Sequence, residues 1–351
     1  MKRAAPAAIA PLVIAWQRAH GRHGLPWQGR DPYRVWLSEV MLQQTQVATV
    51  LGYYTRFVER FPDVAALAAA SADEVLALWS GLGYYSRARN LHACAQTVMR
   101  EHGGRFPPTS AELVRLPGIG RSTAAAIAAF CFGERAAILD GNVKRVLTRV
   151  LGFEADLSQA ANERALWAQA EALLPPTNIE EYTQGLMDLG ATLCSARAPK
   201  CPVCPLRAVC VGAFEGRPER YPVKTRKGVR GRRENVWLWL QWRNATWLVR
   251  RPDRGIWAGL WSLPEFASPD DAQAASAGWP GHAITLPSFT HTLTHLDWTL
   301  HPVSWTLPER SPAKQVAALV ERWPEGRWMS QPEALAAGLP APLRRLLAAA
   351  S

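Results

Sequence analysis

Four cysteines in the middle of the chain have the spacing of a metal site. Cys194, Cys201, Cys204 and Cys210 follow the pattern C-x6-C-x2-C-x5-C, whereas the other two cysteines are isolated. Thiolates this close in sequence can share a zinc ion or a [4Fe–4S] cluster, and the spacing alone leaves both open. Such clustering argues against a disulfide scaffold and for a reducing compartment.

A glycine-containing turn between two predicted helices has the residues of a phosphate site. Residues 116–124 read LPGIGRSTA, with Pro117 ending one helix and Gly118 and Gly120 permitting a tight turn. Backbone N–H groups at such a turn, together with the dipole of the following helix, favour a bound anion. The pattern therefore predicts contact with a DNA phosphate.

Helices must position these residues in the first part of the chain. Apolar residues between 33 and 41 recur at helical spacing behind a predicted N-cap, Asp31. A second helix is predicted after Ser71, with Glu74 completing a capping box. The alanine-rich segment 122–132 predicts a buried helix.

The last third of the chain has a different composition. Eleven of the 16 tryptophans lie there, and residues 236–242 and 247–250 read as two strands joined by a turn at 243–246. Residues 217–233 carry eight basic and one acidic side chain, a net charge of +7, and read as a linker. The part before it is +4 and the part after it is neutral.

Length and charge limit the class of protein. The chain has 351 residues, which predicts two domains, and a net charge of +11 indicates a polyanionic partner, either nucleic acid or an acidic membrane. Its 48% hydrophobic content excludes a largely disordered chain. The apolar run 4–16 is too short to span a bilayer. It follows Lys2 and Arg3 as in a signal peptide, but without a clear cleavage site.

Several motifs resemble one enzyme family. The hairpin, the cysteine spacing and residues 139–145 (LDGNVKR) are similar to the endonuclease III superfamily of helix–hairpin–helix DNA glycosylases. More narrowly, residues 25–27 (LPW), 36–46 (WLSEVMLQQTQ) and 81–90 (GLGYYSRARN) resemble the MutY-type adenine DNA glycosylases. The resemblance is close over 12–212 and looser over 234–348.

The resemblance implies an α+β multidomain protein. An all-α helix–hairpin–helix glycosylase part is expected over 1–216, with a six-helix barrel at about 31–140 and a [4Fe–4S] subdomain from 1–30 plus 141–216. The linker 217–233 and an α/β MutT (Nudix)-like domain over 234–351 would follow. The family thus favours iron over zinc for the four cysteines.

The resemblance also implies an activity. A monofunctional base-excision enzyme would hydrolyse the N-glycosidic bond of adenine mispaired with 8-oxoguanine or G in duplex DNA. We expect it to act as a cytoplasmic, nucleoid-associated monomer with no membrane partner. The alternatives are an endonuclease III-like oxidised-pyrimidine glycosylase with lyase activity, and a non-catalytic Fe–S DNA-binding protein.

This chemistry needs an acid for the base and a carboxylate for the positive charge on the sugar. Glu39 lies beside the apolar face of Trp36 and Val40, where burial would raise its pKa. Asp140 precedes a helix predicted over 143–149, whose N-terminus would keep it ionised. By resemblance, Glu39 is the acid and water activator, Asp140 stabilises or briefly bonds to the sugar carbon, and Asn142 places water.

Further positions match the family's DNA contacts. Ser122 stands where bifunctional members have a lysine nucleophile, so strand cleavage through a Schiff base is not expected. Adenine must leave the stack, and wedge residues must replace it. The matching residues are Gln44, Leu82 and Tyr84 for the wedge; Trp27, Gln28 and Gln184 for the adenine pocket; and Arg87, Arg89, Leu116, Gly118, Gly120, Arg121, Ser122 and Lys144 for the DNA backbone.

The C-terminal domain is expected to recognise rather than hydrolyse. Gly259 is followed at MutT spacing by Glu265, but the remaining glutamates of a pyrophosphatase are missing. The segment 289–295 resembles the family's 8-oxoguanine-sensing loop and ends in Leu293, Thr294 and His295, with a hydroxyl retained and an aromatic lost.

Overall fold

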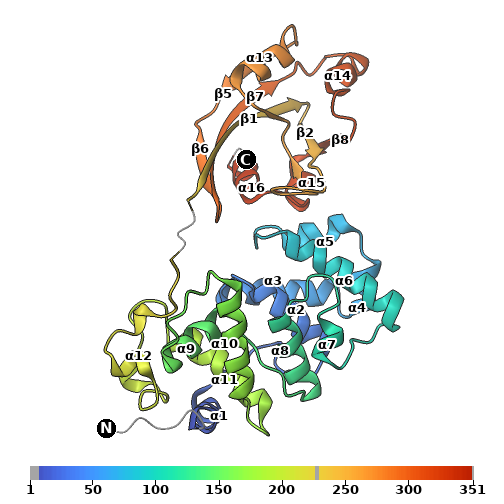
Figure 1. Ribbon diagram of the computed structural model, residues 1–351. Coiled ribbons are helices and arrows are strands. Elements are labelled where there is room, and N and C mark those ends of the chain that lie inside the picture. Colours follow the sequence, from blue (N-terminus) through green and yellow to red (C-terminus); the bar gives the residue numbers. More distant parts are fainter. Residues whose placement is uncertain (1–7, 226–228, 350–351) are drawn as a thin grey trace. The chain divides into compact units, whose positions relative to one another are not determined.

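The computed structural model describes residues 8–225 and 229–349 (Figure 1). Their internal contacts divide them into two units. The helical unit comprises the residues up to 69 and those from 93 to the linker, and the sheet unit comprises 70–92 and the residues after the linker. The first seven residues of the expected cluster subdomain, linker residues 226–228, and the last two residues of the C-terminal domain lie outside the described residues.

Helices account for the regular structure of the helical unit. They are α1 (Ile9–His20), α2 (Pro32–Leu42), α3 (Val47–Arg60), α4 (Val64–Ala69), α6 (Ser86–His102, which starts in the sheet unit), α7 (Ser110–Leu113), α8 (Arg121–Phe132), α9 (Gly141–Leu151), α10 (Ala160–Ala172), α11 (Ile179–Thr192), η2 (Cys201–Val203), α12 (Val211–Phe214) and η3 (Pro218–Arg220). A continuous core joins α1, α8, α9, α10 and α11. The small side chains of α8 let α2, α7 and α11 approach it closely.

Predicted caps begin three of the helices. The Asp31 side chain accepts a hydrogen bond from Tyr33 N, and Ser71 and Glu74 form both bonds of a capping box at the start of α5 (Ala72–Trp79). Asp140 accepts one from the backbone N–H of Val143 at 2.7 Å. These bonds satisfy N–H groups that a helix N-terminus leaves unpaired and fix where the helices start; α9 begins at Gly141, two residues before the predicted start.

The sheet unit contains α5, the start of α6 and one mixed eight-stranded sheet with the order β3-β2-β1-β7-β5. Strands β4, β6 and β8 pair with β1, β7 and β2, respectively. The strands are β1 (Gly231–Trp242), β2 (Ala245–Arg250), β3 (Trp261–Ser262), β4 (Glu265–Phe266), β5 (His282–Thr285), β6 (Phe289–Thr292), β7 (Leu296–Thr306) and β8 (Gly326–Ser330). Helices α13 (Pro269–Ser276), α14 (Ala313–Val320), α15 (Gln331–Ala336) and α16 (Ala341–Ala348) complete it, and Figure 1 shows the strands curving around α16.

Strand β1 is longer than its apolar segment predicts. It pairs in parallel with β7 from Gly231 onward, so the last three residues of the expected linker are part of this strand. Backbone pairing, which does not depend on side-chain hydrophobicity, explains the extension. The turn to β2 contains only Arg243 and Asn244, because Arg243 adopts a left-handed backbone with φ of 48°.

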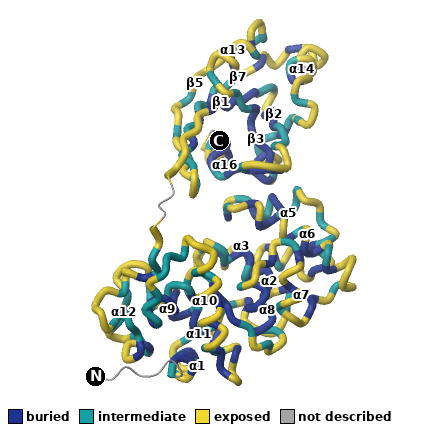
Figure 2. Tube along the Cα trace, viewed as in Figure 1, coloured by how far each residue is buried: buried dark blue, intermediate teal, exposed yellow. Residues whose placement is uncertain are grey.

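Each unit has its own buried interior. Figure 2 shows buried positions along α2 and α8 in the helical unit and along β1 and β2 in the sheet unit. Trp237 and Trp298 are fully buried within the sheet unit, which accounts for part of the tryptophan enrichment. None of the helices formed by the described residues is long and apolar enough to cross a membrane.

Candidate active site and DNA-binding elements

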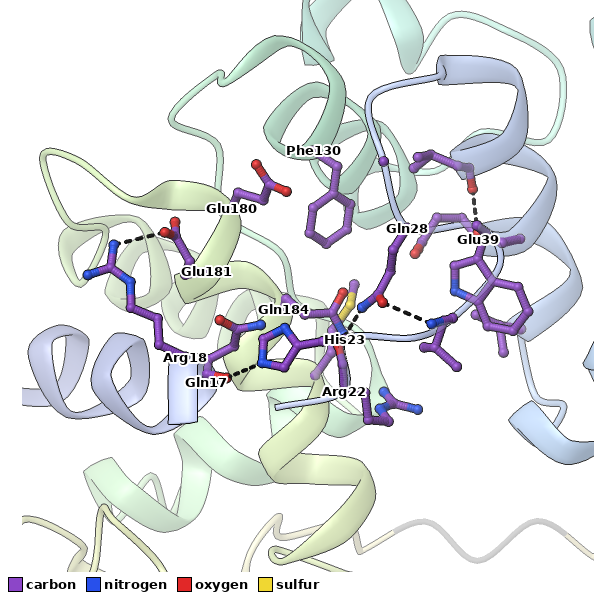
Figure 3. Close-up of a pocket in the computed structure, with 17 residues that line it drawn as sticks. Gln17, Arg18, Arg22, His23, Gln28, Glu39, Phe130, Glu180, Glu181 and Gln184 are labelled. Carbon is purple, nitrogen blue, oxygen red and sulfur yellow. Dashed lines mark hydrogen bonds and ion pairs between the residues drawn. The ribbon is translucent and has the colours of Figure 1, made fainter. Parts of the chain in front are cut away.

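A cavity of about 470 Å³ opens in the helical unit between α1, α2 and α11 (Figure 3). Its volume is in the range of small-molecule sites. The structure brings four predicted site residues to this cavity: Glu39 from α2, Trp27 and Gln28 from the preceding loop, and Gln184 from α11. The catalytic acid and the adenine-pocket residues of the sequence prediction therefore face one space.

Glu39 has the electrostatic environment of a general acid. Its half-buried side chain lines the cavity, and desolvation, with a smaller contribution from the negative charge of Asp140, raises its pKa from 4.5 to about 8. Both effects disfavour the carboxylate. At neutral pH, Glu39 therefore carries a proton that it can donate.

Asp140 is an N-cap residue in a buried position. Hydrogen bonds from the N–H groups of Val143 and Asn142 lower its pKa, but burial outweighs them, and the net shift is upward. The helix end therefore favours the carboxylate, as the sequence analysis expects, while loss of solvent acts in the opposite direction and is the larger effect. Arg145 and Lys144 act against this shift.

The start of α9 is tied to neighbouring segments. Asn142 Oδ1 accepts a hydrogen bond from Arg145 Nη2 at 2.8 Å, and the same guanidinium donates to the carbonyl oxygens of Gly190 and Cys194, each at 2.7 Å. Ser122 Oγ accepts from Leu139 N at 3.0 Å. Ser122 thus holds the segment before Asp140 and supplies no amine.

The sequence prediction missed a partly buried ion pair beside the cavity. Asp188 is fully buried and accepts hydrogen bonds from Arg22 Nε at 2.7 Å and Arg22 N at 2.9 Å. Gln184 Nε2 donates to the same carboxylate at 2.8 Å. Asp188 stands four residues after Gln184, a helical spacing that brings two side chains to one face and that could have signalled the contact.

The two amides of the cavity have different roles. Gln28 Oε1 accepts from Leu25 N at 3.0 Å, and its Nε2 donates to the Arg22 carbonyl, so both ends bind the chain. Gln184 uses its Nε2 for Asp188. The carbonyl oxygen of Gln184 is consequently the end that can accept a hydrogen bond from a molecule in the cavity.

The four cysteines line one small cavity with Arg149 and Leu193. Arg149 is only 2% exposed and donates to Cys194 Sγ at 3.3 Å and to the carbonyl oxygens of Ser195 and Ala196. Within the described ranges, no group of three or more His, Cys, Asp or Glu residues is placed so that it could hold a metal ion. The four thiols around one space have the chemistry of an iron–sulfur donor set, but their positions in this structure are not those of bound ligands.

The predicted hairpin lies between α7 and α8. Leu116 is buried, Gly118 has a φ of 74°, and Gly120 is the N-cap of α8. Arg121 forms an ion pair with Glu171 and stacks 3.9 Å above the Trp167 ring. A bound phosphate would compete with the carboxylate for this guanidinium.

Lys144 is paired in the same way. Its ammonium forms an ion pair with Glu163, and its side chain is 29% exposed. A phosphate contact by Lys144 would require DNA to displace or share this carboxylate. Both pairs are partly exposed, where exchange of ionic partners costs little free energy.

Two predicted wedge residues adopt left-handed backbone conformations. Gln44 is exposed with a φ of 59°, and Tyr84 is 44% exposed with a φ of 49°. For residues with a side chain, this conformation costs free energy and is concentrated at functional sites. The third wedge residue, Leu82, is buried at 6% exposure.

Arg87 and Arg89 both donate hydrogen bonds to backbone carbonyl oxygens, and Arg87 is buried whereas Arg89 is partly exposed. Arg87 is 8% exposed and donates to Gly83 O at 3.2 Å, and burial lowers its pKa to about 10. Arg89 Nη1 donates to Ala258 O at 2.8 Å. The segment between α5 and α6, residues 80–85, carries Leu82 and Tyr84, and we call it the wedge turn. These contacts do not favour the phosphate contacts expected from the sequence and give both arginines a role in supporting the wedge turn.

The candidate 8-oxoguanine residues form the tip of the β6–β7 hairpin. Leu293 N donates to Leu296 O at 2.8 Å and closes the tip, where Thr294 and His295 are exposed. The hydroxyls of Tyr84 and Thr294 lie 3.1 Å apart. The sheet unit thus joins two elements that the sequence prediction treated separately.

The MutT-type glutamate is engaged in the interior of the sheet unit. Glu265 forms ion pairs with Arg233 and, at 2.8 Å, with Arg251. Its side chain is 15% exposed. These pairs give Glu265 a structural role in the sheet unit.

Comparisons with known proteins agree with this site. Residues 37–171 match the HhH-GPD family, described as "HhH-GPD superfamily base excision DNA repair protein", and residues 235–349 match the NUDIX domain. In the solved structures, a thermostable thymine-DNA glycosylase has a TM-score of 0.54 at 28% identity and covers 60% of this chain and 97% of its own. A non-covalent endonuclease III–DNA complex has a TM-score of 0.52 at 24% identity over 61% of this chain and 98% of its own, which shows a common fold.

Curated relatives span both units. The adenine DNA glycosylase of Buchnera aphidicola subsp. Acyrthosiphon pisum (strain APS) is 34% identical over 343 residues, covering 97% of this chain and 96% of the relative. The Homo sapiens adenine DNA glycosylase is 32% identical over 92% of this chain and 70% of its own length. With the site described above, this similarity shows that the chain belongs to the adenine DNA glycosylase family.

Proposed function

We propose that this protein removes adenine mispaired with 8-oxoguanine or G from duplex DNA by hydrolysing its N-glycosidic bond. The observation that carries the proposal is Glu39, a carboxyl with a pKa of about 8 in the cavity that also contains Trp27, Gln28 and Gln184. A protonated acid at a site of this size suits protonation of a purine leaving group. The flipped adenine would occupy the cavity, with its exocyclic amine donating to the Gln184 carbonyl oxygen.

The steps after protonation of the base would use Asp140, Glu39 and Asn142. As the base leaves, positive charge develops on the sugar, and Asp140 in its ionised form stabilises it or bonds briefly to the sugar carbon. Glu39, having given up its proton, can then take one from the attacking water, which Asn142 helps to place. With Ser122 in place of an amine nucleophile, the reaction ends at an abasic site without strand cleavage.

DNA binding would use the hairpin, the linker and the wedge. Gln44 and Tyr84 would fill the gap left by adenine, and Thr294 with Tyr84 would face 8-oxoguanine. Cys194, Cys201, Cys204 and Cys210 would hold a [4Fe–4S] cluster, which when bound braces their loop. We propose that the enzyme acts as a monomer on nucleoid DNA in the cytoplasm.

Base release from defined duplexes tests the proposal. Duplexes with A opposite 8-oxoguanine, A opposite G, or an oxidised pyrimidine are incubated with the protein, and abasic sites are cleaved by alkali. Release of adenine without strand cleavage before alkali is the expected result. Cleavage of the pyrimidine duplex alone would favour an endonuclease III-like enzyme, and binding without release would favour a non-catalytic protein. Brown colour with iron and sulfide in the purified protein tests the cluster separately.

A further inference from the structure

The wedge segment is docked on the C-terminal part of the chain. Residues 70–92 share the sheet unit with the residues after the linker. Arg250 from β2 forms a 2.9 Å ion pair with Asp73 of α5. Arg89, at the start of α6, donates to the Ala258 carbonyl oxygen. Both sides of the wedge turn therefore contact the C-terminal part.

Several hydrogen bonds join the end of α5 to the C-terminal part of the chain. Ser80 Oγ donates to the Leu339 carbonyl oxygen at 2.9 Å and accepts from Arg344 Nη2 at 2.9 Å and Nε at 3.2 Å. The Tyr85 hydroxyl donates to the same Leu339 carbonyl oxygen at 3.0 Å. Arg344 also donates to the Ala337 carbonyl oxygen at 2.9 Å. We call Ser80, Tyr85, Leu339 and Arg344 the turn junction.

The turn junction surrounds a strained residue. Tyr84 lies between Ser80 and Tyr85 in sequence and has its left-handed φ of 49°. The turn is closed by Trp79 Nε1, which donates to Gly83 O at 3.0 Å. A conformation of this kind costs free energy and persists where the surrounding structure over-determines it. The contacts of the turn junction, on both sides of Tyr84, meet that condition.

The side chain of Tyr84 contacts the tip of the β6–β7 hairpin. Its hydroxyl lies 3.1 Å from that of Thr294. Each hydroxyl can donate or accept a hydrogen bond, so the pair can respond to a difference in donors and acceptors between two purines. Guanine presents N7 as an acceptor, whereas 8-oxoguanine presents an N7–H donor and an O8 acceptor there.

We propose that Ser80 and Arg344 are positioning residues that hold Tyr84 against Thr294, so that the two hydroxyls read the base opposite adenine as one element. This inference rests on the proposed function, because it concerns the choice between 8-oxoguanine and G. Neither residue touches the reacting atoms. Their loss changes the preference between the two mispairs and leaves the reaction on A opposite G intact.

Matched substitutions on both sides of the turn junction test this inference. Ser80→Ala removes the hydroxyl, and Ser80→Thr keeps it and is the control. Arg344→Gln removes the guanidinium of the turn junction, and Arg345→Gln removes the guanidinium of its exposed neighbour and is the control. Single-turnover adenine release is measured on A opposite 8-oxoguanine and on A opposite G. Ser80→Ala and Arg344→Gln are expected to lower the ratio of the two rates about tenfold, the size of coupling within one contact network. Ser80→Thr and Arg345→Gln are expected to keep it.

Hydrogen exchange of the free protein supplies a second readout. Amides 81–85 are expected to exchange faster in Ser80→Ala than in Ser80→Thr, with the rest of the chain unchanged. Parallel loss of both reaction rates, or an unchanged ratio in a folded Ser80→Ala protein, would overturn the inference. A wild type that does not prefer 8-oxoguanine would instead refute that part of the proposed function. In that case, equal exchange in the Ser80 pair would overturn the inference and faster exchange in Ser80→Ala would support it.

Discussion

The carboxylate of Asp188 accepts a 2.8 Å hydrogen bond from Gln184 Nε2 and, by the same contact, determines which end of that amide faces the cavity. Asp188 is fully buried, and Arg22 is its ion-pair partner. Adenine carries a donor amine where hypoxanthine carries an acceptor oxygen. With its Nε2 bound to Asp188, Gln184 has a carbonyl oxygen left to accept from a base, which favours adenine.

Asp188→Asn is expected to relax this choice. An Asn amide can rotate to donate to Gln184, which turns the Gln184 amide round and presents a donor to the base. The ratio of adenine to hypoxanthine release is expected to fall about tenfold. This is the size of effect expected when one hydrogen bond that distinguishes two bases is lost. Loss of the negative charge that pairs with Arg22 is expected to lower the free energy of unfolding by less than the ~3 kcal/mol of a fully buried pair, because the Arg22 side chain is 30% exposed. Glu181→Gln, which breaks the more exposed pair with Arg18, is the control; equal ratios in the two variants would contradict the assignment.

Glu39→Gln is expected to stop base release while DNA binding persists. The amide has the same size and no proton to donate, so the single-turnover rate should fall by about 10²–10⁴. Affinity for a duplex with A opposite 8-oxoguanine, measured by anisotropy, should stay within about twofold, since the phosphate contacts that dominate affinity are unchanged. Full activity in this variant would remove Glu39 as the acid.

The raised pKa of Glu39 also predicts a pH dependence of activity. Because the protonated form is the acid, kcat/KM should be lost as the pH rises through about 8. The pH profile of wild-type base release locates this basic limb. A limb unmoved by Glu39→Asp, whose shorter side chain changes the desolvation, would assign it to another group.

The free energy of unfolding should also depend on the protonation of Glu39, and it should fall as the pH rises. Glu39 titrates at about 8 in the folded chain and near 4.5 in the unfolded chain, so the folded state binds the extra proton between these values. The free energy of unfolding of the wild type should therefore fall relative to Glu39→Gln as the pH rises from about 4.5 to about 8. Denaturant titrations of both proteins at a series of pH values measure the difference. A constant difference would mean that the pKa of Glu39 is not raised.

The linker should contribute to the salt dependence of DNA binding. Arg217 and Lys224 are exposed in this basic segment. Each phosphate contact contributes about one unit to the slope of log affinity against log salt, so Arg217→Gln with Lys224→Gln should reduce the slope by up to about two. Arg322→Gln, at an exposed position of the electrically neutral C-terminal part, is the control. An unchanged slope would make the linker a solvated connector only.

Local chemistry made much of the fold predictable. Helix starts at Asp31, Ser71 and Asp140 follow from side chains that cap within three residues, and the buried α8 follows from its run of small apolar residues. The strands β1 and β2 follow from β-branched and aromatic runs. The start of β1 did not, since residues 231–233 are polar and join the strand only by pairing with β7, more than 60 residues away.

The chain by itself thus determined the types of residue available for catalysis: a carboxyl in an apolar helix, a capping carboxyl, four clustered thiols and no lysine at position 122. Tertiary structure alone decided their surroundings. Burial, which depends on helices distant in sequence, raised the pKa of both Glu39 and Asp140. Tertiary structure also placed Asp188 against Arg22 and Tyr84 against Thr294, and it buried Arg87. Desolvation and long-range contacts are properties of the folded chain, and no local spacing encodes them.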